Sequence, residues 1–261
     1  MIVMSSSDLD LKASGAGASL AARLRSDDTL VFLSAVTPDR GRGLDVSMGN
    51  LQMAEQVCGA LAAVKPAHVV YISSDAVYRE TVAFVDEDSP ADAIALYGAM
   101  HAFRERMLLQ ALTGTGTSLA ILRPTLVFGA ADTHNSYGPN RFMRSALKTG
   151  KINIFGEGEE YRDHIFVDDA ARLVVDVIRH GSDGVLNLVT GDSIAYGALA
   201  TLVAEIGKGV AVVEQVPRSG PVTILHRHYD ATAIHRTFPQ FTFTPRRKAL
   251  ERAWAGYLAA Q

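Results

Sequence analysis

The sequence predicts an α/β fold built on a doubly wound parallel sheet, and three observations lead to this class. Short runs rich in β-branched residues alternate with longer amphipathic segments, a pattern typical of parallel strands joined by crossover helices. The short runs are apolar almost throughout, as expected of strands that are covered on both faces. The chain has 261 residues, enough for one large α/β domain or for a core with a smaller second lobe.

The first half of the chain carries the predicted core of this sheet. The helices are assigned from apolar residues that recur at three- and four-residue spacing, and Pro66 and Gly114 close them. In order, the expected elements are a strand at 29–33, a helix at 50–64, a strand at 68–72, a helix at 97–112 and a strand at 118–122.

Beyond Pro124 the sequence becomes more polar and richer in turns. Residues 129–139 are expected to form a loop that crosses the mouth of the sheet. The elements expected after this loop are a helix at 140–147, a strand at 152–155, a helix at 167–179, a strand at 185–188 and helices at 199–206 and 248–258.

Composition restricts the class of protein. Hydrophobic residues make up 48% of the chain and charged residues 20%, as in folded, water-soluble proteins. The net charge of −3 provides no basic field for nucleic acid or for an anionic membrane. The single cysteine, Cys58, cannot form an internal disulfide, and the start of the chain lacks the features of a signal peptide. We therefore expect a cytoplasmic protein with no membrane or nucleic-acid partner.

A hydroxyl and a tyrosine form the candidate catalytic group. Ser74 follows the strand at 68–72, Tyr97 comes 23 residues later (97 − 74) at the start of a helix, and His101 lies four residues beyond it (101 − 97). A tyrosine and a serine hydroxyl at the carboxyl end of a parallel strand can polarise an alcohol or a ketone. Asp75 adds a carboxylate at the same strand end. Each residue also has a structural interpretation, because Asp75, for example, can simply cap the following turn.

At these residues the chain resembles the extended short-chain dehydrogenase/reductase family, the NAD-dependent epimerases and dehydratases of nucleotide sugars. The family signature is Ser or Thr with Tyr-x-x-x-Lys, and here His101 occupies the lysine position. The resemblance implies that Tyr97 is the acid/base and that Ser74 hydrogen-bonds the reacting oxygen. The family's lysine lowers the tyrosine pKa and holds the nicotinamide ribose. Histidine, with an ordinary pKa of about 6.5, is only partly charged at neutral pH.

The residue after Asp75 bears on the type of reaction. In the family's dehydratases an acidic pair follows the Ser or Thr, whereas here Ala76 follows Asp75. The resemblance therefore favours epimerisation or the reduction of a keto sugar over 4,6-dehydration.

The resemblance is strongest on the substrate side, at 123–129 (RPTLVFG), 139–142 and 156–169. It implies that Asn140 meets the substrate diphosphate and that Arg162 binds the nucleotide phosphate, for which a guanidinium fork is suited. Arg162 can alternatively pair with Asp163 or Glu159 at the surface. Two further arginines are weaker candidates for a second phosphate contact, namely Arg218 and Arg227.

On the cofactor side the resemblance implies NAD or NADP. The family begins with a strand and a glycine-rich phosphate loop, but residues 15–20 are the only partial match here, and Leu20 stands at the third glycine position. A better alignment places Ile2–Ser5 at the family's third strand. It implies a cofactor site of Asp10 and Leu11 beside the adenine, Ser34, Ala35 and Val36 at a strand end, Tyr97 and His101, and Pro124 and Val127 on the nicotinamide side.

By this alignment the first strand, its helix and the second strand are missing. The strand at 29–33 would then have an open edge. Either the start of the sequence is truncated, or the protein is a natural degenerate member that closes its sheet in another way.

The implied fold is a Rossmann-like doubly wound parallel sheet, incomplete at its N-terminal side, with a small interleaved C-terminal substrate lobe. The expected core is 1–130, continued by 163–190, and the lobe is mainly 131–162 and 191–261. The resemblance also implies a homodimer formed through the helices at 50–64 and 97–112. The alternative is that these helices pack only within the monomer.

Two functions stay open at this stage. The first is an NAD(P)-dependent enzyme that epimerises or reduces a nucleotide sugar. The second is a catalytically impaired member that binds a nucleotide sugar or a partner, a hypothesis favoured by His101 and by the missing glycine-rich loop. No metal site is expected, because no ligand set accompanies the closely spaced His226 and His228. Cys58 is interpreted as a packing residue.

Overall fold

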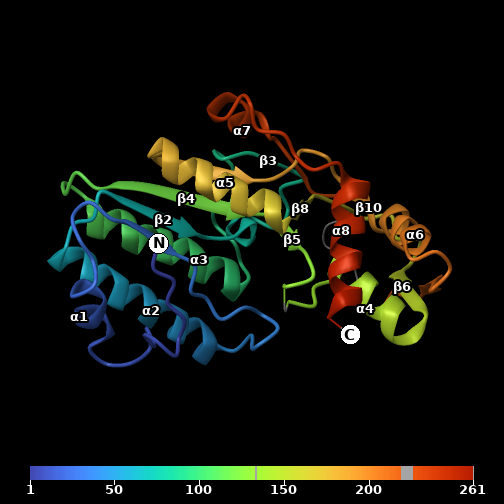
Figure 1. Cartoon of the computed structure of the whole chain (residues 1–261), viewed down its shortest axis with the longest axis horizontal. Coiled ribbons are helices and arrows are strands. Elements are labelled where there is room, and N and C mark those ends of the chain that lie inside the picture. The colour runs from blue at the N-terminus through green and yellow to red at the C-terminus, as the bar shows by residue number, and fades with distance from the viewer. Residues whose placement is uncertain (133, 219–225, 261) are drawn as a thin grey trace. The chain divides into compact units, whose positions relative to one another are not determined.

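The computed structural model describes residues 1–132, 134–218 and 226–260 (Figure 1). The chain divides into two compact units that interleave along the sequence. Unit 1 comprises 1–79, 90–123 and 175–186, and unit 2 comprises 80–89, 124–174 and 187–261. The division into core and substrate lobe expected from the sequence stays a prediction.

Unit 1 is built on the predicted parallel sheet, with strand order β1-β2-β4-β9. Strand β1 pairs in parallel with β2, and β2 pairs in parallel with β4. The strands are β1 (Thr29–Phe32), β2 (His68–Ile72), β4 (Ser118–Pro124) and β9 (Gly184–Leu188). Their almost uniformly apolar sequences are explained by their burial, since every residue of β2 from His68 to Tyr71 is buried.

Helices cover both faces of this sheet, as expected of a doubly wound fold. Figure 1 shows α2 (Leu44–Ala63) and α3 (Leu96–Leu112) on one face and the carboxyl-terminal part of α5 (Val167–His180) on the other. The short helix α1 (Ala16–Ala21) packs against α2. The core between α2, α3 and the sheet includes side chains from each of them, among them Val57, Leu61, Tyr71, Leu108 and Ile121.

Helix α2 begins six residues earlier than predicted (50 − 44). The polar residues and the glycine of its first two turns hide the helical periodicity from a sequence reading. Asp45 lies in the first turn of α2, where a negative charge interacts favourably with the helix dipole.

The strand placed at Ile2–Ser5 is wrong, because these residues form no regular element. The side chain of Ile2 is 82% exposed and that of Val3 is 77% exposed. A strand is stable only when its backbone N–H and C=O groups are paired with an adjacent strand. Among the described residues, no strand lies where the alignment requires a partner for residues 2–5. Strand β1 is accordingly an edge of the sheet, as the alignment predicts.

Unit 2 consists of helices packed around short strand pairs. Its main helices are α4 (Pro139–Thr149), α6 (Tyr196–Ile206) and α8 (Arg246–Ala259), and α7 (Thr232–Thr237) is shorter. Strand β6 (Lys151–Phe155) pairs in parallel with β11 (Val212–Val216). Three further pairs are shorter: β5 (Leu126–Phe128) with β8 (His164–Phe166), β7 (Tyr161–Arg162) with β10 (Ile194–Ala195), and β3 (Phe84–Val85) with β12 (His228–Tyr229).

The predicted helices and the strand at 152–155 are all present in unit 2, whereas most of its short strands were not anticipated. Helices α4, α6 and α8 enclose a core with β6, which contains Phe142, Ile152, Val203, Leu250 and Trp254. The two-residue strands have too few positions to show an alternating pattern, so the sequence does not reveal them.

Candidate functional site

Ser74 lies in a tight turn directly after β2. The turn is a single 3-10 helix, η1 (Asp75–Val77), and Ser74 is its N-cap residue. The Ser74 hydroxyl oxygen accepts a hydrogen bond from the backbone N–H of Ala76 at 3.1 Å. The cap fixes the Ser74 oxygen at the carboxyl end of the sheet, where parallel α/β sheets place their ligands.

Tyr97 is held beside this turn by a close backbone approach. The next residue, Gly98, is so near η1 that an added Cβ would lie 1.9 Å from the carbonyl oxygen of Ala76. Only glycine allows the first turn of α3 to reach this position. Burial raises the pKa of Tyr97, and the negative charge of Asp75 acts in the same direction. The structure therefore brings Ser74, Asp75 and Tyr97 together within unit 1.

The phenol of Tyr97 holds its proton firmly. Burial raises its pKa to about 12, and the carboxylates of Asp75 and Asp39 act in the same direction. Burial of a tyrosine disfavours the charged phenolate, because the protein interior solvates a charge less well than water does. At neutral pH Tyr97 is therefore a proton donor rather than a base.

His101 is turned into the core and carries no charge at neutral pH. It is 1% exposed, and its Nδ1 shares a hydrogen bond with the Tyr71 hydroxyl at 2.6 Å. Burial, together with the positive charge of Arg104, lowers its pKa to about 3. The ring of Tyr97 meets the His101 ring edge-on at 4.7 Å between centroids. The partial charge expected from an ordinary histidine is therefore absent, and His101 gives Tyr97 a packing surface.

The glycine segment 15–20 does not form a phosphate cradle. The N–H of Gly17 donates to the side-chain oxygen of Gln56 at 2.8 Å, and α1 packs on α2 instead of following a strand. Because a phosphate loop requires free N–H groups at a strand end, this segment does not fit the dinucleotide pyrophosphate.

The residues that follow β1 fit the flat part of a cofactor better. Leu33 is 64% exposed at the carboxyl end of β1, Ser34 is also exposed, and Ala35 is half-buried. The side-chain amide of Asn50 accepts from the N–H of Val36 at 2.8 Å and donates to its carbonyl at 3.0 Å. An apolar stretch of rigid backbone at a strand end is a suitable surface for a ring or a ribose.

The remaining cofactor candidates belong to both units. The Asp10 carboxylate accepts from the N–H of Lys12 at 3.0 Å, and Leu11 packs against the core below α2. Pro124 and Val127 belong to unit 2, where Val127 lies in β5 opposite Ile165. The part that these four residues take in binding a cofactor stays a prediction.

In unit 2, the predicted substrate residue Asn140 is fully engaged inside the protein. It is 2% exposed, and its amide oxygen accepts from the N–H of Gly129 and from the Tyr257 hydroxyl, each at 3.0 Å. Its amide nitrogen donates to the Asp132 carboxylate at 2.6 Å. Asn140 thus fastens the loop at 129–132 to α4, and a direct contact with a diphosphate would require these bonds to break.

The two acids considered as partners for Arg162 are bound to other groups. The Asp163 carboxylate is fully buried and accepts from the backbone N–H groups of Thr190 and Gly191. Glu159 pairs with Arg218 at 2.9 Å. The guanidinium of Arg162 lies 6.0 Å from the Tyr196 ring centroid, and its Nη1 donates to the carbonyl of Tyr161.

The other two candidate arginines are less suited to phosphate. Arg218 also pairs with Glu160 at 3.1 Å, so two carboxylates balance its charge. Arg227 is 9% exposed, and its guanidinium lies over the ring of Tyr229.

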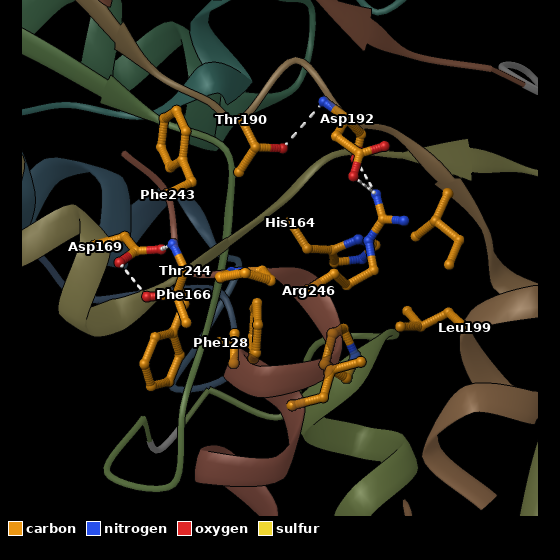
Figure 2. Close-up of a pocket in the computed structure, with 15 residues that line it drawn as sticks. Phe128, His164, Phe166, Asp169, Thr190, Asp192, Leu199, Phe243, Thr244 and Arg246 are labelled. Carbon is orange, nitrogen blue, oxygen red and sulfur yellow. Dashed lines mark hydrogen bonds and ion pairs between the residues drawn. The ribbon is translucent and has the colours of Figure 1, made fainter. Parts of the chain in front are cut away.

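Unit 2 also contains a cavity of about 150 Å³, shown in Figure 2. Its apolar wall includes Phe128, Phe166 and Phe243. His164 lies among these side chains, and neither of its ring nitrogens has a hydrogen-bond partner. An ion pair between Arg246 and Asp192, 2.6 Å long, borders the same space. The three predicted substrate residues of unit 2 are not among the described residues that line it. The sequence reading did not identify this cavity.

A comparison with models of known protein families identifies the family of this chain. The model described as "NAD dependent epimerase/dehydratase family" matches residues 6–189. The chain belongs to this family. The match includes Ser74, Tyr97 and Arg162, whereas Arg218 lies beyond it.

One relative of known identity is an epimerase. A 155-residue segment is 28% identical to N-acetyl-alpha-D-glucosaminyl-diphospho-ditrans,octacis-undecaprenol 4-epimerase of Escherichia coli O157:H7. That segment is 56% of this chain but 44% of the relative, so the chain matches less than half of that protein's length.

Two solved structures show the same fold. UDP-N-acetylglucosamine 4-epimerase from Methanobrevibacter ruminantium M1, in complex with UDP-N-acetylmuramic acid, has a TM-score of 0.84 at 20% identity, over 97% of this chain and 83% of that one. RMD from Pseudomonas aeruginosa, complexed with NADPH, has a TM-score of 0.83 at 18% identity, over 97% and 88%. Proteins with this fold thus include one that holds UDP-N-acetylmuramic acid and one that holds NADPH.

The sequence reading missed a buried polar network behind the catalytic candidates. The Glu105 carboxylate pairs with Arg123 at 2.7 Å and accepts from the Ser73 hydroxyl at 2.5 Å. Arg123 also donates to the Tyr78 hydroxyl at 3.0 Å. The signal in the sequence is positional, because Glu105 stands four residues after His101 on the buried face of a helix. A charged residue at a core position indicates a partner elsewhere in the chain.

Two searches of the described residues gave no candidates. No helix in this part of the chain is both long and apolar enough to span a membrane. Over the same residues, no three potential metal ligands gather at one point.

We predict that Gly98→Ala displaces α3 from η1 and destabilises the protein by several kcal/mol, because the new Cβ would overlap the Ala76 carbonyl oxygen. Urea denaturation followed by circular dichroism measures the change. Gly59→Ala in α2 is the matched control. No atom lies within 4 Å of the added Cβ there, so the control should gain stability by about 1 kcal/mol from helix propensity. Equal effects at the two glycines would contradict the proposed close approach.

We also predict that His164 makes the stability of the folded protein sensitive to acid. Burial, Arg246 and Arg162 lower its pKa to about 3, so below an unfolded-state pKa of about 6.5 only the unfolded chain takes up this proton. Stability should therefore fall as the pH drops from 6.5 towards 3. In His164→Phe the loss between pH 7.5 and pH 4.5 should be smaller by about 2 kcal/mol.

Thermal and urea unfolding at the two pH values test this prediction. His235→Phe is the control, since its ring is exposed to water in the folded state. An unchanged pH dependence in His164→Phe would show that the buried ring does not control acid stability.

Proposed function

We propose that this chain is an NAD(P)-dependent enzyme that epimerises a nucleotide sugar or reduces a keto sugar by hydride transfer. The observation that carries the proposal is the docking of α3 on η1, which sets Tyr97 beside Ser74 and Asp75 at the carboxyl end of the sheet. The family to which the chain belongs is described as NAD-dependent, which supports the cofactor class.

Each residue has a defined part in this proposal. Tyr97 donates the proton to the substrate oxygen, and the capped Ser74 hydroxyl hydrogen-bonds the same oxygen and fixes its position. A pKa of about 12 keeps Tyr97 protonated at neutral pH, the state that can donate a proton when a ketone is reduced. A bound dinucleotide would supply the hydride, and the exposed stretch at Leu33–Ala35 would support it.

The substrate class rests on Arg162. Its guanidinium presents a planar set of donors that suits phosphate oxygens. A structurally similar 4-epimerase is known in complex with UDP-N-acetylmuramic acid, which supports a nucleoside-diphosphate sugar as the substrate class. Asn140 would then act indirectly, by shaping the loop at 129–132.

A second candidate function is a nucleotide-sugar-binding or partner module without redox chemistry. It is favoured by the neutral, buried His101 and by the unsuitable glycine segment at 15–20. The two functions differ in whether a nicotinamide dinucleotide binds.

We further propose that the protein is a homodimer that acts in the cytoplasm. Large apolar side chains are exposed along the helices expected to form the interface, with Leu44 and Met48 on α2 and Leu96, Phe103 and Leu109 on α3. Exposed apolar side chains of this size are typical of surfaces that a partner covers.

We predict that the 261-residue chain binds NAD(H) or NADP(H) in the micromolar range or tighter, and that Tyr97→Phe lowers turnover of a nucleotide keto sugar by at least about 100-fold. Calorimetric titration and a stopped assay of nicotinamide absorbance measure these quantities. Tyr161→Phe, on β7 of unit 2, is the control and should keep its turnover. Absence of dinucleotide binding favours the module, and full turnover in Tyr97→Phe removes Tyr97 from the mechanism.

We predict that Phe103→Lys shifts the protein from dimer to monomer, because an unpaired charge is costly in an apolar interface. Sedimentation velocity checks the oligomeric state. The same change at Phe84, which is 61% exposed on β3 of unit 2, should leave the dimer intact. A monomeric unsubstituted protein would refute the dimer at once.

A further inference from the structure

Helix α3 carries a buried positive charge that the roles described above do not use. Arg104 is 0% exposed, and its Nη2 donates to the carbonyl of Ser34 at 2.8 Å. The other two guanidinium nitrogens, Nε and Nη1, are buried without a hydrogen-bond partner. A buried charge with unpaired donors costs several kcal/mol, so a functional reason for it is expected.

The residues around Arg104 reduce the free-energy cost of burying its charge, but they do not neutralise the charge. Its guanidinium carbon lies 4.3 Å from the ring centroid of Phe32 and 5.1 Å from that of Tyr71, which are cation–π distances. The adjacent carboxylate, Glu105, is already paired with Arg123. The charge of Arg104 is therefore held at the carboxyl end of β1 by aromatic faces and one carbonyl.

Arg104 and Tyr97 share one face of α3. The helical spacing of seven residues (104 − 97) places both over the sheet, with His101 between them on the same stripe. His101 bonds the hydroxyl of Tyr71, whose ring is one of the two that hold Arg104. The contacts between the Tyr97 phenol and the guanidinium therefore run through the neutral rings of His101 and Tyr71.

The charges around Tyr97 have opposite effects on its ionised form. Asp75 in η1 and Asp39 in the segment before α2 disfavour it, and Arg104 favours it. His101 supplies no charge from the position where the family has lysine. Among these charged groups, Arg104 is therefore the cation that acts on Tyr97. It lies about one helical turn beyond the position where the family has lysine.

We propose that Arg104 is a positioning residue whose charge stabilises the Tyr97 oxyanion formed during proton transfer, in place of a cation at position 101. The role rests on the proposed function. When the Tyr97 O–H bond breaks, the proton passes to the substrate oxygen and the electron pair stays on the Tyr97 oxygen. The guanidinium then has a counter-charge, and its own burial becomes less unfavourable.

The test measures the ionisation of residue 97 without cofactor or substrate. Tyr97 is replaced by 3,5-difluorotyrosine, which ionises within the stable pH range, and ¹⁹F NMR follows its titration in the full chain. We expect Arg104→Met to raise the midpoint by about one pH unit, a tenfold loss in the ionisation constant. Arg104→Lys should retain most of the effect. Arg106→Met, an exposed arginine two residues further on α3, should not move the midpoint.

A second neutral variant guards against a folding defect. Arg104→Gln keeps a donor for the Ser34 carbonyl, and its midpoint should rise as in Arg104→Met. Adding His101→Lys to either neutral variant should bring the midpoint back down, because it returns a cation to the helix face. Thermal unfolding confirms that each variant is folded.

The proposal is overturned if the folded Met and Gln variants titrate like the unsubstituted chain. It is also overturned if they shift no more than Arg106→Met. Because the titration needs neither dinucleotide nor sugar, it fails or succeeds independently of the proposed enzyme function. If the midpoint shifts but the protein binds no dinucleotide, the electrostatic role of Arg104 stands and the proposed enzymatic function does not.

Discussion

The close approach of α3 to η1 is the constraint on which the candidate site depends. An α-carbon without a side chain at Gly98 lets the helix start against the Ala76 carbonyl, and this fixes the direction of every residue further along the helix. Tyr97 is thereby placed beside the Ser74 turn. Four and eight residues on, His101 and Glu105 enter the core. The same contact therefore determines both the catalytic candidates and the buried charges behind them.

The buried charges behind the site differ in how well they are paired, and this difference indicates different roles. Glu105 and Arg123 are matched by a short ion pair that the Ser73 and Tyr78 hydroxyls complete. Arg104 has a single carbonyl and two aromatic faces. A buried pair with all its hydrogen bonds made is a structural device, whereas a buried charge without a counter-ion stores free energy that an anion can release. The site thus has a structural ion pair and an unsatisfied cation at consecutive positions of α3.

Much of this fold follows from local sequence pattern. Apolar runs and helical periodicity were sufficient to predict β1, β2 and β4 and the longer helices of both units, because these properties depend on residues close in sequence. The six-residue helices α1 and α7 were not predicted. The strand at Ile2–Ser5 failed for a physical reason: its apolar sequence suits a strand, but no neighbouring strand is described that can pair with it. The catalytic candidates were found from their spacing together with the resemblance to the family signature. Their electrostatics were not, since the pKa of Tyr97 and the neutrality of His101 result from burial and from Asp75, Asp39 and Arg104.

The replacement of lysine by His101 is best understood together with Arg104. A lysine at position 101 would place a second positive charge one turn from the buried guanidinium, and two unpaired cations in one low-dielectric region repel each other strongly. A neutral histidine removes that repulsion and, through Tyr71, fills the space beside the guanidinium. Arg104 in turn removes the need for charge at position 101. The two residues are therefore expected to act as one unit, in which a cation on this face of α3 belongs at one position or the other but not at both.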